Sequence, residues 1–140
     1  MFELIYRSLA KGGINTTDIT GILNKSRNFN SQNDITGCLL FYNNEFIQIL
    51  EGDKKKVTEL YATIKKDRRH TDVMLLDENE KEERIFTNWS MAYFDLNGAD
   101  VKEADKLLFI ENFIITANIT EKPTHAVKLF WHIAKQMLEE

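Results

Sequence analysis

The sequence predicts an α+β domain with a ferredoxin-like five-stranded sheet, two helices on one face and two C-terminal helices on the opposite face. Three observations predict this fold. Strand-like and helix-like hydrophobic patterns follow one another in the order β-α-β-β-α-β-β. The strand patterns are apolar on both faces, so each face of the sheet needs a cover. Two further helical patterns follow the last strand and can supply the second cover.

The N-terminal segment predicts a strand followed by a helix. Residues 4–9 alternate between two faces, and the pair Gly12-Gly13 ends this strand. Thr16 or Thr17 is expected to cap the helix, which carries apolar residues at helical spacing to about residue 28. The segment therefore starts the sheet and places the first helix over it.

A hairpin and a second helix are predicted next. Residues 35–42 form an apolar strand, Asn43-Asn44 is a turn signal, and residues 46–51 form the returning strand. Asp53 is a suitable N-cap for a helix that extends to about residue 66. We expect this helix to lie beside the first one.

The remaining pattern predicts two strands and two helices. Residues 73–76 begin a fourth strand, residues 77–84 form a charged strand end and turn, and residues 86–94 form a fifth strand. A helix is expected to begin near Asp100 with a capping-box-like start, and Pro123 is expected to open the last helix.

The composition is that of an ordinary globular domain. The 140 residues are 43% hydrophobic and 29% charged, which suffices for one domain with a sizeable core. The net charge of -4 gives no electrostatic basis for binding nucleic acid. A single cysteine, Cys38, excludes an internal disulfide and a cysteine-based zinc site. No apolar stretch could span a membrane and no signal pattern is visible, so we expect a cytoplasmic protein without a membrane partner.

An amide stands in the middle of an apolar strand. Gln48 is flanked by Phe46-Ile47 and Ile49-Leu50. A buried amide costs free energy unless both its carbonyl and its NH2 group have partners. A neighbouring side chain or a water can supply them, and so can a ligand with donors and acceptors along one edge. The strand alone leaves these alternatives open.

Five segments around this amide point to a known family. They are Tyr6-Arg7-Ser8, Asn30-x4-Ile35-Thr36-Gly37, Phe46-Ile47-Gln48-Ile49-Leu50-Glu51-Gly52, Asp67-Arg68-Arg69-His70 and Phe86-Thr87-Asn88-Trp89-Ser90-Met91. In this order and spacing they closely resemble the BLUF family of blue-light sensors that use FAD. The resemblance runs from Tyr6 to about Tyr93. It implies a BLUF flavin-binding domain at residues 1–97 and a C-terminal helical extension packed on the sheet at residues 98–140.

The resemblance also implies roles for individual residues. Tyr6 matches the electron-donating tyrosine and Gln48 the switching glutamine between tyrosine and flavin. Trp89 and Met91 match the strand pair that transmits the light signal. No metal site is implied. The implied flavin-binding set comprises Tyr6, Ser26, Asn30, Gln48, Arg69 and His70.

The residue types suit the flavin edge that the resemblance implies. Flavin offers N5, O4 and O2 as acceptors and N3–H as a donor. The Asn30 amide can donate and accept at once, which suits the O4/N3 edge. Arg69 would stabilise negative charge that accumulates on the ring. One position departs from the family pattern, because Phe29 stands where many relatives carry a second asparagine.

We therefore expect a blue-light photoreceptor that binds FAD noncovalently, and not an enzyme. Light-driven electron and proton transfer through Tyr6 and Gln48 would switch hydrogen bonds and alter protein–protein association. The expected partners are FAD and a second copy of the chain, a downstream protein, or both, with no nucleic acid. The cyclase and phosphodiesterase activities of longer relatives are not carried over.

Two other functions remain as alternatives. One is a small ferredoxin-like hydrolase of the acylphosphatase type, which the sequence supports poorly because no Gly-rich phosphate loop precedes either helix. The other is a ligand-binding interaction module without light sensing. The colour of the purified protein separates all three functions.

Overall fold

The computed structural model describes residues 1–86, 92–95 and 124–139. Trp89, Met91 and the helix expected near Asp100 lie outside these residues. None of the described helices is long and apolar enough to cross a membrane.

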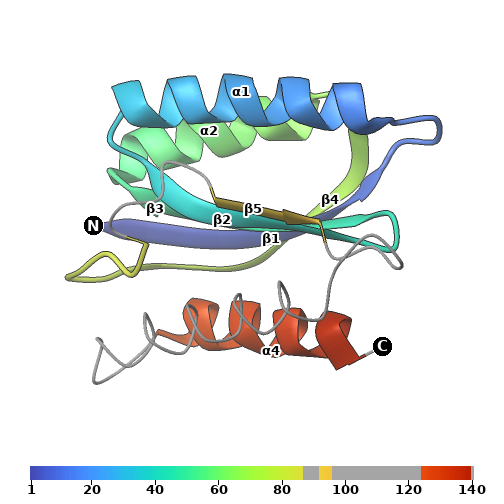
Figure 1. Cartoon of the computed structure of the whole chain (residues 1–140). Coiled ribbons are helices and arrows are strands. Elements are labelled where there is room, and N and C mark those ends of the chain that lie inside the picture. Colours follow the sequence, from blue (N-terminus) through green and yellow to red (C-terminus); the bar gives the residue numbers. More distant parts are fainter. Residues whose placement is uncertain (87–91, 96–123, 140) are drawn as a thin grey trace.

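Helices cover both faces of the sheet, as the sequence predicts (Figure 1). Helices α1 (Thr16–Gln32) and α2 (Lys54–Lys66) lie side by side on one face. Helix α4 (His125–Glu139) lies on the opposite face. The arrangement is an α+β fold of the ferredoxin-like type.

The two strands that carry Tyr6 and Gln48 are neighbours in the sheet but not in sequence. The strands are β1 (Phe2–Ala10), β2 (Thr36–Tyr42), β3 (Glu45–Gly52), β4 (His70–Glu80) and β5 (Ala92–Asp95). Their order in the sheet is β4-β1-β3-β2-β5, in which β4, β1, β3 and β2 are antiparallel neighbours and β5 runs parallel to β2. The β1–β3 register places Tyr6 opposite Gln48.

Strand alternation produces two hydrophobic cores. Leu4, Tyr6 and Leu50 belong to the core under α1 and α2. Ile5 and Ile47 belong to the core that α4 covers. Because successive strand residues point to opposite faces, the polar residues of β1 and β3 are divided between the two sides in the same way.

The first helix begins one residue earlier than predicted and ends later. Its N-cap is Asn15, so the prediction of Thr16 or Thr17 is wrong. The Asn15 side chain accepts a hydrogen bond from Asp18 N at 2.9 Å, and the Asp18 carboxylate accepts from Asn15 N at 3.1 Å. This reciprocal pair is a capping box built on asparagine, which is at least as favourable an N-cap as threonine. The helix continues to Gln32 instead of residue 28, which places Asn30 in its last turn.

The fourth strand begins three residues earlier than predicted, at His70, and the fifth begins later. β4 ends at Glu80 inside the charged stretch of residues 77–84, as predicted, and its charged side chains are tolerated because β4 is the edge strand beside β1. Phe86 precedes β5 and is not a strand residue, which corrects the predicted start. Its backbone N–H bonds to the Glu51 carboxylate at 2.8 Å instead of to a neighbouring strand.

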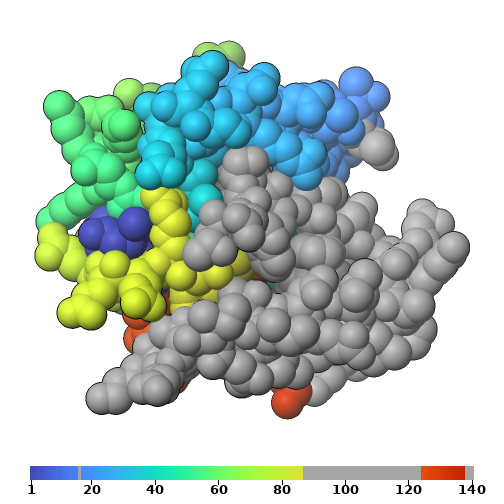
Figure 2. All heavy atoms as spheres, turned by 60° about the vertical axis from the view of Figure 1, so that its left-hand side comes forward, coloured from blue at the N-terminus to red at the C-terminus, as the bar shows by residue number. Residues whose placement is uncertain are grey.

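A buried ionic cluster joins the segment after β4 to the middle strands. Glu3 and Glu51 are opposite each other in the β1–β3 register, and both are 0% exposed. The Lys81 ammonium contacts Glu51 Oε2 and lies 2.7 Å from Glu3 Oε2, with 5% of the Lys81 side chain exposed. Lys81 N also donates to Met1 O at 2.8 Å, and Figure 2 shows this segment packed beside the N-terminus.

We predict that Lys81→Met destabilises the fold by about 3–5 kcal/mol, because it leaves two buried carboxylates without their ammonium partner. Urea unfolding followed by circular dichroism measures the change. Lys54→Met is the matched control, since Lys54 pairs with Glu80 at 3.8 Å on the exposed surface and should contribute little. Equally small changes in both variants would contradict the prediction.

Candidate functional site

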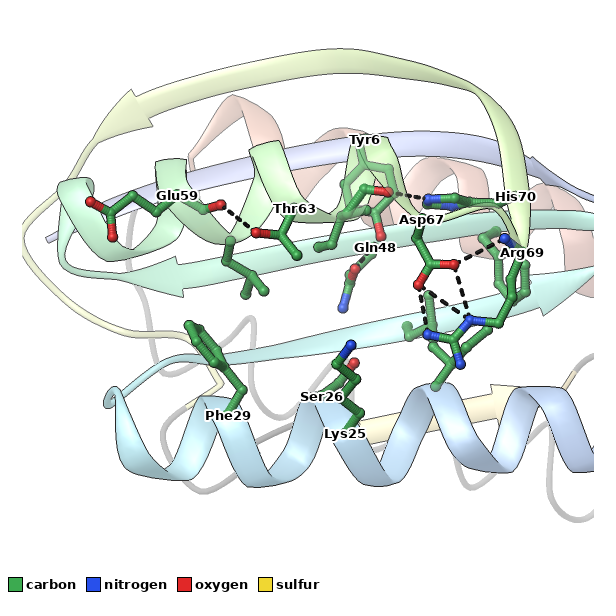
Figure 3. A pocket seen from close by; sticks show the side chains of 15 residues that line it. Tyr6, Lys25, Ser26, Phe29, Gln48, Glu59, Thr63, Asp67, Arg69 and His70 are labelled. Atoms are coloured by element: carbon green, nitrogen blue, oxygen red, sulfur yellow. Dashed lines mark hydrogen bonds and ion pairs between the residues drawn. The ribbon is translucent and has the colours of Figure 1, made fainter.

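A pocket of about 310 Å³ lies between the sheet and helices α1 and α2 (Figure 3). Most of the surface exposed inside it is apolar, although many of the lining side chains also carry a polar group. A mainly apolar wall with polar groups set into it is typical of small-molecule sites. The lining residues are Tyr6, Ile22, Lys25, Ser26, Phe29, Leu39, Phe46, Gln48, Glu59, Leu60, Thr63, Ile64, Asp67, Arg69 and His70.

The pocket brings together five of the six residues predicted to bind the cofactor. They are Tyr6, Ser26, Gln48, Arg69 and His70. Asn30 is buried one turn beyond Ser26 on α1 and is not among the lining residues. Its backbone oxygen accepts a bond from Ile35 N at 2.9 Å, which fixes the end of α1 against the start of the hairpin.

Tyr6 supplies one of the partners that the buried Gln48 amide requires. The Tyr6 hydroxyl donates a hydrogen bond to Gln48 Oε1. The two residues are 3% and 4% exposed. Figure 3 shows the Gln48 nitrogen directed across the pocket toward α1. The amide therefore accepts from Tyr6 at one end and presents its donor end to the pocket.

Tyr6 is held as a neutral phenol. Burial raises the pKa of Tyr6 far above its usual value of 10.0, and the neighbouring Tyr61 and Asp67 raise this pKa further. The Tyr61 ring lies 5.5 Å from the Tyr6 ring between centroids. Because the anionic form is so unfavourable here, Tyr6 keeps its hydroxyl proton and remains a hydrogen-bond donor at neutral pH.

Arg69 is held at the pocket by a clamp that the sequence analysis did not assign to the site. Its Nε donates to Asp67 Oδ1 at 3.0 Å and its Nη2 donates to Asp67 Oδ2 at 2.6 Å. The Arg69 backbone N–H also donates to Asp67 Oδ1 at 2.9 Å. These bonds lower the pKa of Asp67 to about 2 and raise the pKa of Arg69. Asp67 stands two residues before Arg69, directly after α2. This short spacing between a carboxylate and a guanidinium is the signal that could have identified Asp67.

His70 joins the end of α2 to β1. Its Nε2 lies 2.5 Å from Ile64 O and its Nδ1 lies 2.9 Å from Ser8 Oγ. A carbonyl oxygen only accepts, so Nε2 carries a hydrogen and the Ser8 hydroxyl can donate to Nδ1. Both ring nitrogens are thus engaged by the protein, and the His70 ring forms part of the pocket wall.

Several lining residues on the two helices were missed from the sequence. On α1, Lys25 and Phe29 line the pocket beside the predicted Ser26. On α2, Glu59 and Thr63 lie four residues apart and line it too. Helical spacing places such residues on one face, and this spacing is the signal that could have found them once the face toward the sheet was known.

A family model covers most of the chain. The family described as "BLUF: Sensors of blue-light using FAD" matches residues 1–92. The photoactivated adenylate cyclase subunit beta of Euglena gracilis is 37% identical over 89 residues, which are 63% of this chain and 10% of that protein. The blue light- and temperature-regulated antirepressor BluF of Escherichia coli is 34% identical over 93 residues, which are 66% of this chain and 23% of that protein. The chain thus matches only a small part of the length of these relatives.

Solved structures share the fold. The dark-state structure of BlrB, a BLUF protein, matches with a TM-score of 0.70 and 26% identity over 96% of each chain. A bacterial light-regulated adenylyl cyclase matches with a TM-score of 0.67 and 33% identity, over 84% of this chain and 34% of that chain. The match to BlrB extends beyond the region that the family model covers.

We predict that Asp67→Asn flattens the acid dependence of stability. A carboxylate whose pKa falls from 3.8 to about 2 on folding stabilises the fold fully above about pH 4, and this contribution is lost as the pH falls toward 2. Thermal unfolding of the wild type should therefore shift to lower temperature more steeply across this range than that of Asp67→Asn.

Asp72→Asn is the matched control. It removes a nearby exposed carboxylate and leaves the bonds between Asp67 and Arg69 in place. A pH profile of Asp67→Asn that runs parallel to that of the wild type would show that the clamp does not stabilise the fold.

Proposed function

The chain belongs to the BLUF family of blue-light sensors that use FAD, and we propose that its Tyr6–Gln48 pair converts light absorbed at the pocket into a changed hydrogen-bond pattern. It is a blue-light photoreceptor, and its cofactor is FAD. The hydrogen bond from Tyr6 to Gln48 Oε1 in the pocket wall is the observation that carries the proposal.

The pocket residues fit a flavin. The apolar wall suits a flat ring system, and a flavin has acceptors along one edge. The Gln48 NH2 group faces the pocket, and the Arg69 guanidinium is oriented there by Asp67. We propose that Gln48, Arg69 and Ser26 bind the polar edge.

Two further residues complete the proposed binding set. Asn30 lies one helical turn beyond Ser26, and we propose that its side chain bonds the same polar edge. The structure supports a wall contact for His70, because both of its ring nitrogens already have protein partners. These two assignments follow the resemblance and stay predictions.

The protein's own residues provide the route for the proton. FAD, when bound, supplies the absorption of blue light and the capacity to take up an electron and a proton. Burial opposes the anionic form of Tyr6, which argues against loss of its proton alone, and we propose that the proton leaves together with an electron. Gln48 accepts a proton at Oε1 and donates one from its NH2 group, which makes it the relay. When the electron and the proton return to Tyr6, the Gln48 amide is left rotated or tautomerised, with a changed hydrogen bond toward the pocket.

We propose that the output is a change in protein association and not catalysis by this chain. The partner would be a second copy of the chain, a downstream protein, or both. The names of two relatives describe a photoactivated cyclase subunit and an antirepressor, so light sensing in relatives accompanies different outputs. Leu129, Trp131 and Ile133 of α4 are only partly buried against the sheet, which favours this side for association. Signal transmission by Trp89 and Met91 and a cytoplasmic location stay predictions.

Gln48→Leu and Tyr6→Phe should each bind FAD and lose the normal photocycle. The wild type should be yellow and shift its absorption reversibly to the red under blue light. Leucine removes both amide functions at similar volume, and phenylalanine removes only the hydroxyl. Absorption spectra in the dark and under blue light measure the shift. Either variant showing the wild-type shift and yield would contradict its role, and a colourless wild type that cannot be reconstituted with FAD would exclude the whole proposal.

The association state should differ between dark and blue light. Light scattering of the full chain with FAD should give a different mass in the two states, alone or with its downstream partner. Gln48→Leu serves as the control, because it keeps the flavin but should show the same mass in both states. An identical wild-type mass under both conditions, together with an unchanged interaction with any partner, would contradict an association output.

A further inference from the structure

The strand that carries Gln48 also carries a buried carboxylate on its other face. Glu51 lies three residues after Gln48 on β3, so the two side chains point to opposite faces. Gln48 lies in the pocket under α1 and α2, whereas Glu51 lies on the side that α4 covers. Its Oε2 accepts from Ile85 N and its Oε1 accepts from Phe86 N, both at 2.8 Å. Glu51 thus attaches the segment before β5 to the end of β3.

Charged residues of the same segment strengthen this attachment. Lys81 contacts Glu51 Oε2 and lies 2.7 Å from Glu3 Oε2. Arg84 Nη1 donates to Glu51 O at 3.1 Å and to Thr36 Oγ1 at 2.8 Å. Lys81 thus meets both buried carboxylates, while Arg84 fixes the segment to the backbone at the end of β3. The segment cannot move away from β3 without separating Lys81 from its buried carboxylate partners.

Phe86 extends the connection to α4. Its ring packs edge-on against the ring of Phe130, with 6.1 Å between the centroids and 78° between the planes. Phe86 is 1% exposed and Phe130 is 0% exposed. The residue whose N–H is fixed by Glu51 is thus the residue whose side chain contacts α4. β3, Glu51, Phe86 and Phe130 form a continuous path from the pocket strand to the opposite layer.

We propose that Glu51 is a positioning residue that couples β3 to α4 through Phe86, so that a rearrangement at Gln48 changes the packing of α4. The inference rests on the proposed function of Gln48. Two N–H groups share one carboxylate, so a shift of β3 moves the Phe86 backbone with it. Closely packed rings respond to such a shift by repacking, because the interior has little free space. A purely structural Glu51 would stabilise the fold without affecting the response of α4 to light.

Hydrogen exchange of residues 125–139 tests the coupling in the full chain with FAD bound, in the dark and under blue light. The wild type should show a light-dependent change in exchange across α4. Glu51→Gln replaces one carboxylate oxygen with an NH2 group that cannot accept. It should keep the red shift and lose the light–dark difference in α4. Glu45→Gln is the matched control, because Glu45 lies at the other end of β3, pairs with Arg7, and should leave both readouts unchanged.

The red shift and the exchange difference separate two kinds of failure. A wild type without a red shift overturns the proposed function. A wild type with a red shift and no light–dark difference in α4 overturns only the coupling, as does Glu51→Gln with the wild-type difference. If Glu51→Gln fails to bind FAD, Phe130→Leu interrupts the path at its other end and leaves Glu51 intact. Phe130→Leu should keep the red shift and lose the difference in α4, and retention of that difference overturns the coupling.

Discussion

The antiparallel pairing of β1 with β3 is the constraint on which the rest of the structure depends. Its register places Tyr6 opposite Gln48 on one face of the sheet and Glu3 opposite Glu51 on the other. A slip by one residue would turn every side chain of one strand to the wrong face. The hydroxyl–amide bond in the pocket and the ionic cluster toward α4 would both be lost. One set of backbone hydrogen bonds therefore aligns the Tyr6–Gln48 pair, for which we propose the photochemical role, and the Glu51 carboxylate that holds the segment before β5.

The buried polar groups on the two faces of these strands find partners of different kinds. On the pocket side, the neutral side chains of Tyr6 and Gln48 share a hydrogen bond, and burial keeps the Tyr6 proton in place. On the side of α4, the carboxylates of Glu3 and Glu51 are buried, and the Lys81 ammonium contacts both of them. A neutral pair can rearrange at low electrostatic cost, whereas a compensated ionic cluster resists separation. This difference fits the proposed switch at Gln48 on one face and the proposed connection through Glu51 on the other.

Local signals predicted most of the fold. The Asn43-Asn44 turn is confirmed, with φ values of 48° and 67° that asparagine tolerates better than most residues. Asp53 is confirmed as the N-cap of α2, because its carboxylate accepts from Lys56 N. The predicted starts of α1 and β4 were wrong. Asn15 caps α1 in place of the adjacent threonines, and β4 begins at His70 instead of residue 73 because His70 already pairs with Ala10 of β1.

The sequence by itself determined that Tyr6 and Gln48 lie on strands and can share a face, because strand periodicity is local. It also determined the family, since the motifs follow one another in a fixed order. Only the tertiary structure decided that Lys25 and Glu59 line the pocket, because the rotation of each helix about its axis depends on packing against the sheet. The same holds for Lys81, whose carboxylate partners belong to strands far away in sequence. The sequence around Lys81 gives no sign that this side chain is buried, because lysine is usually exposed and its burial depends on how the strands assemble around it.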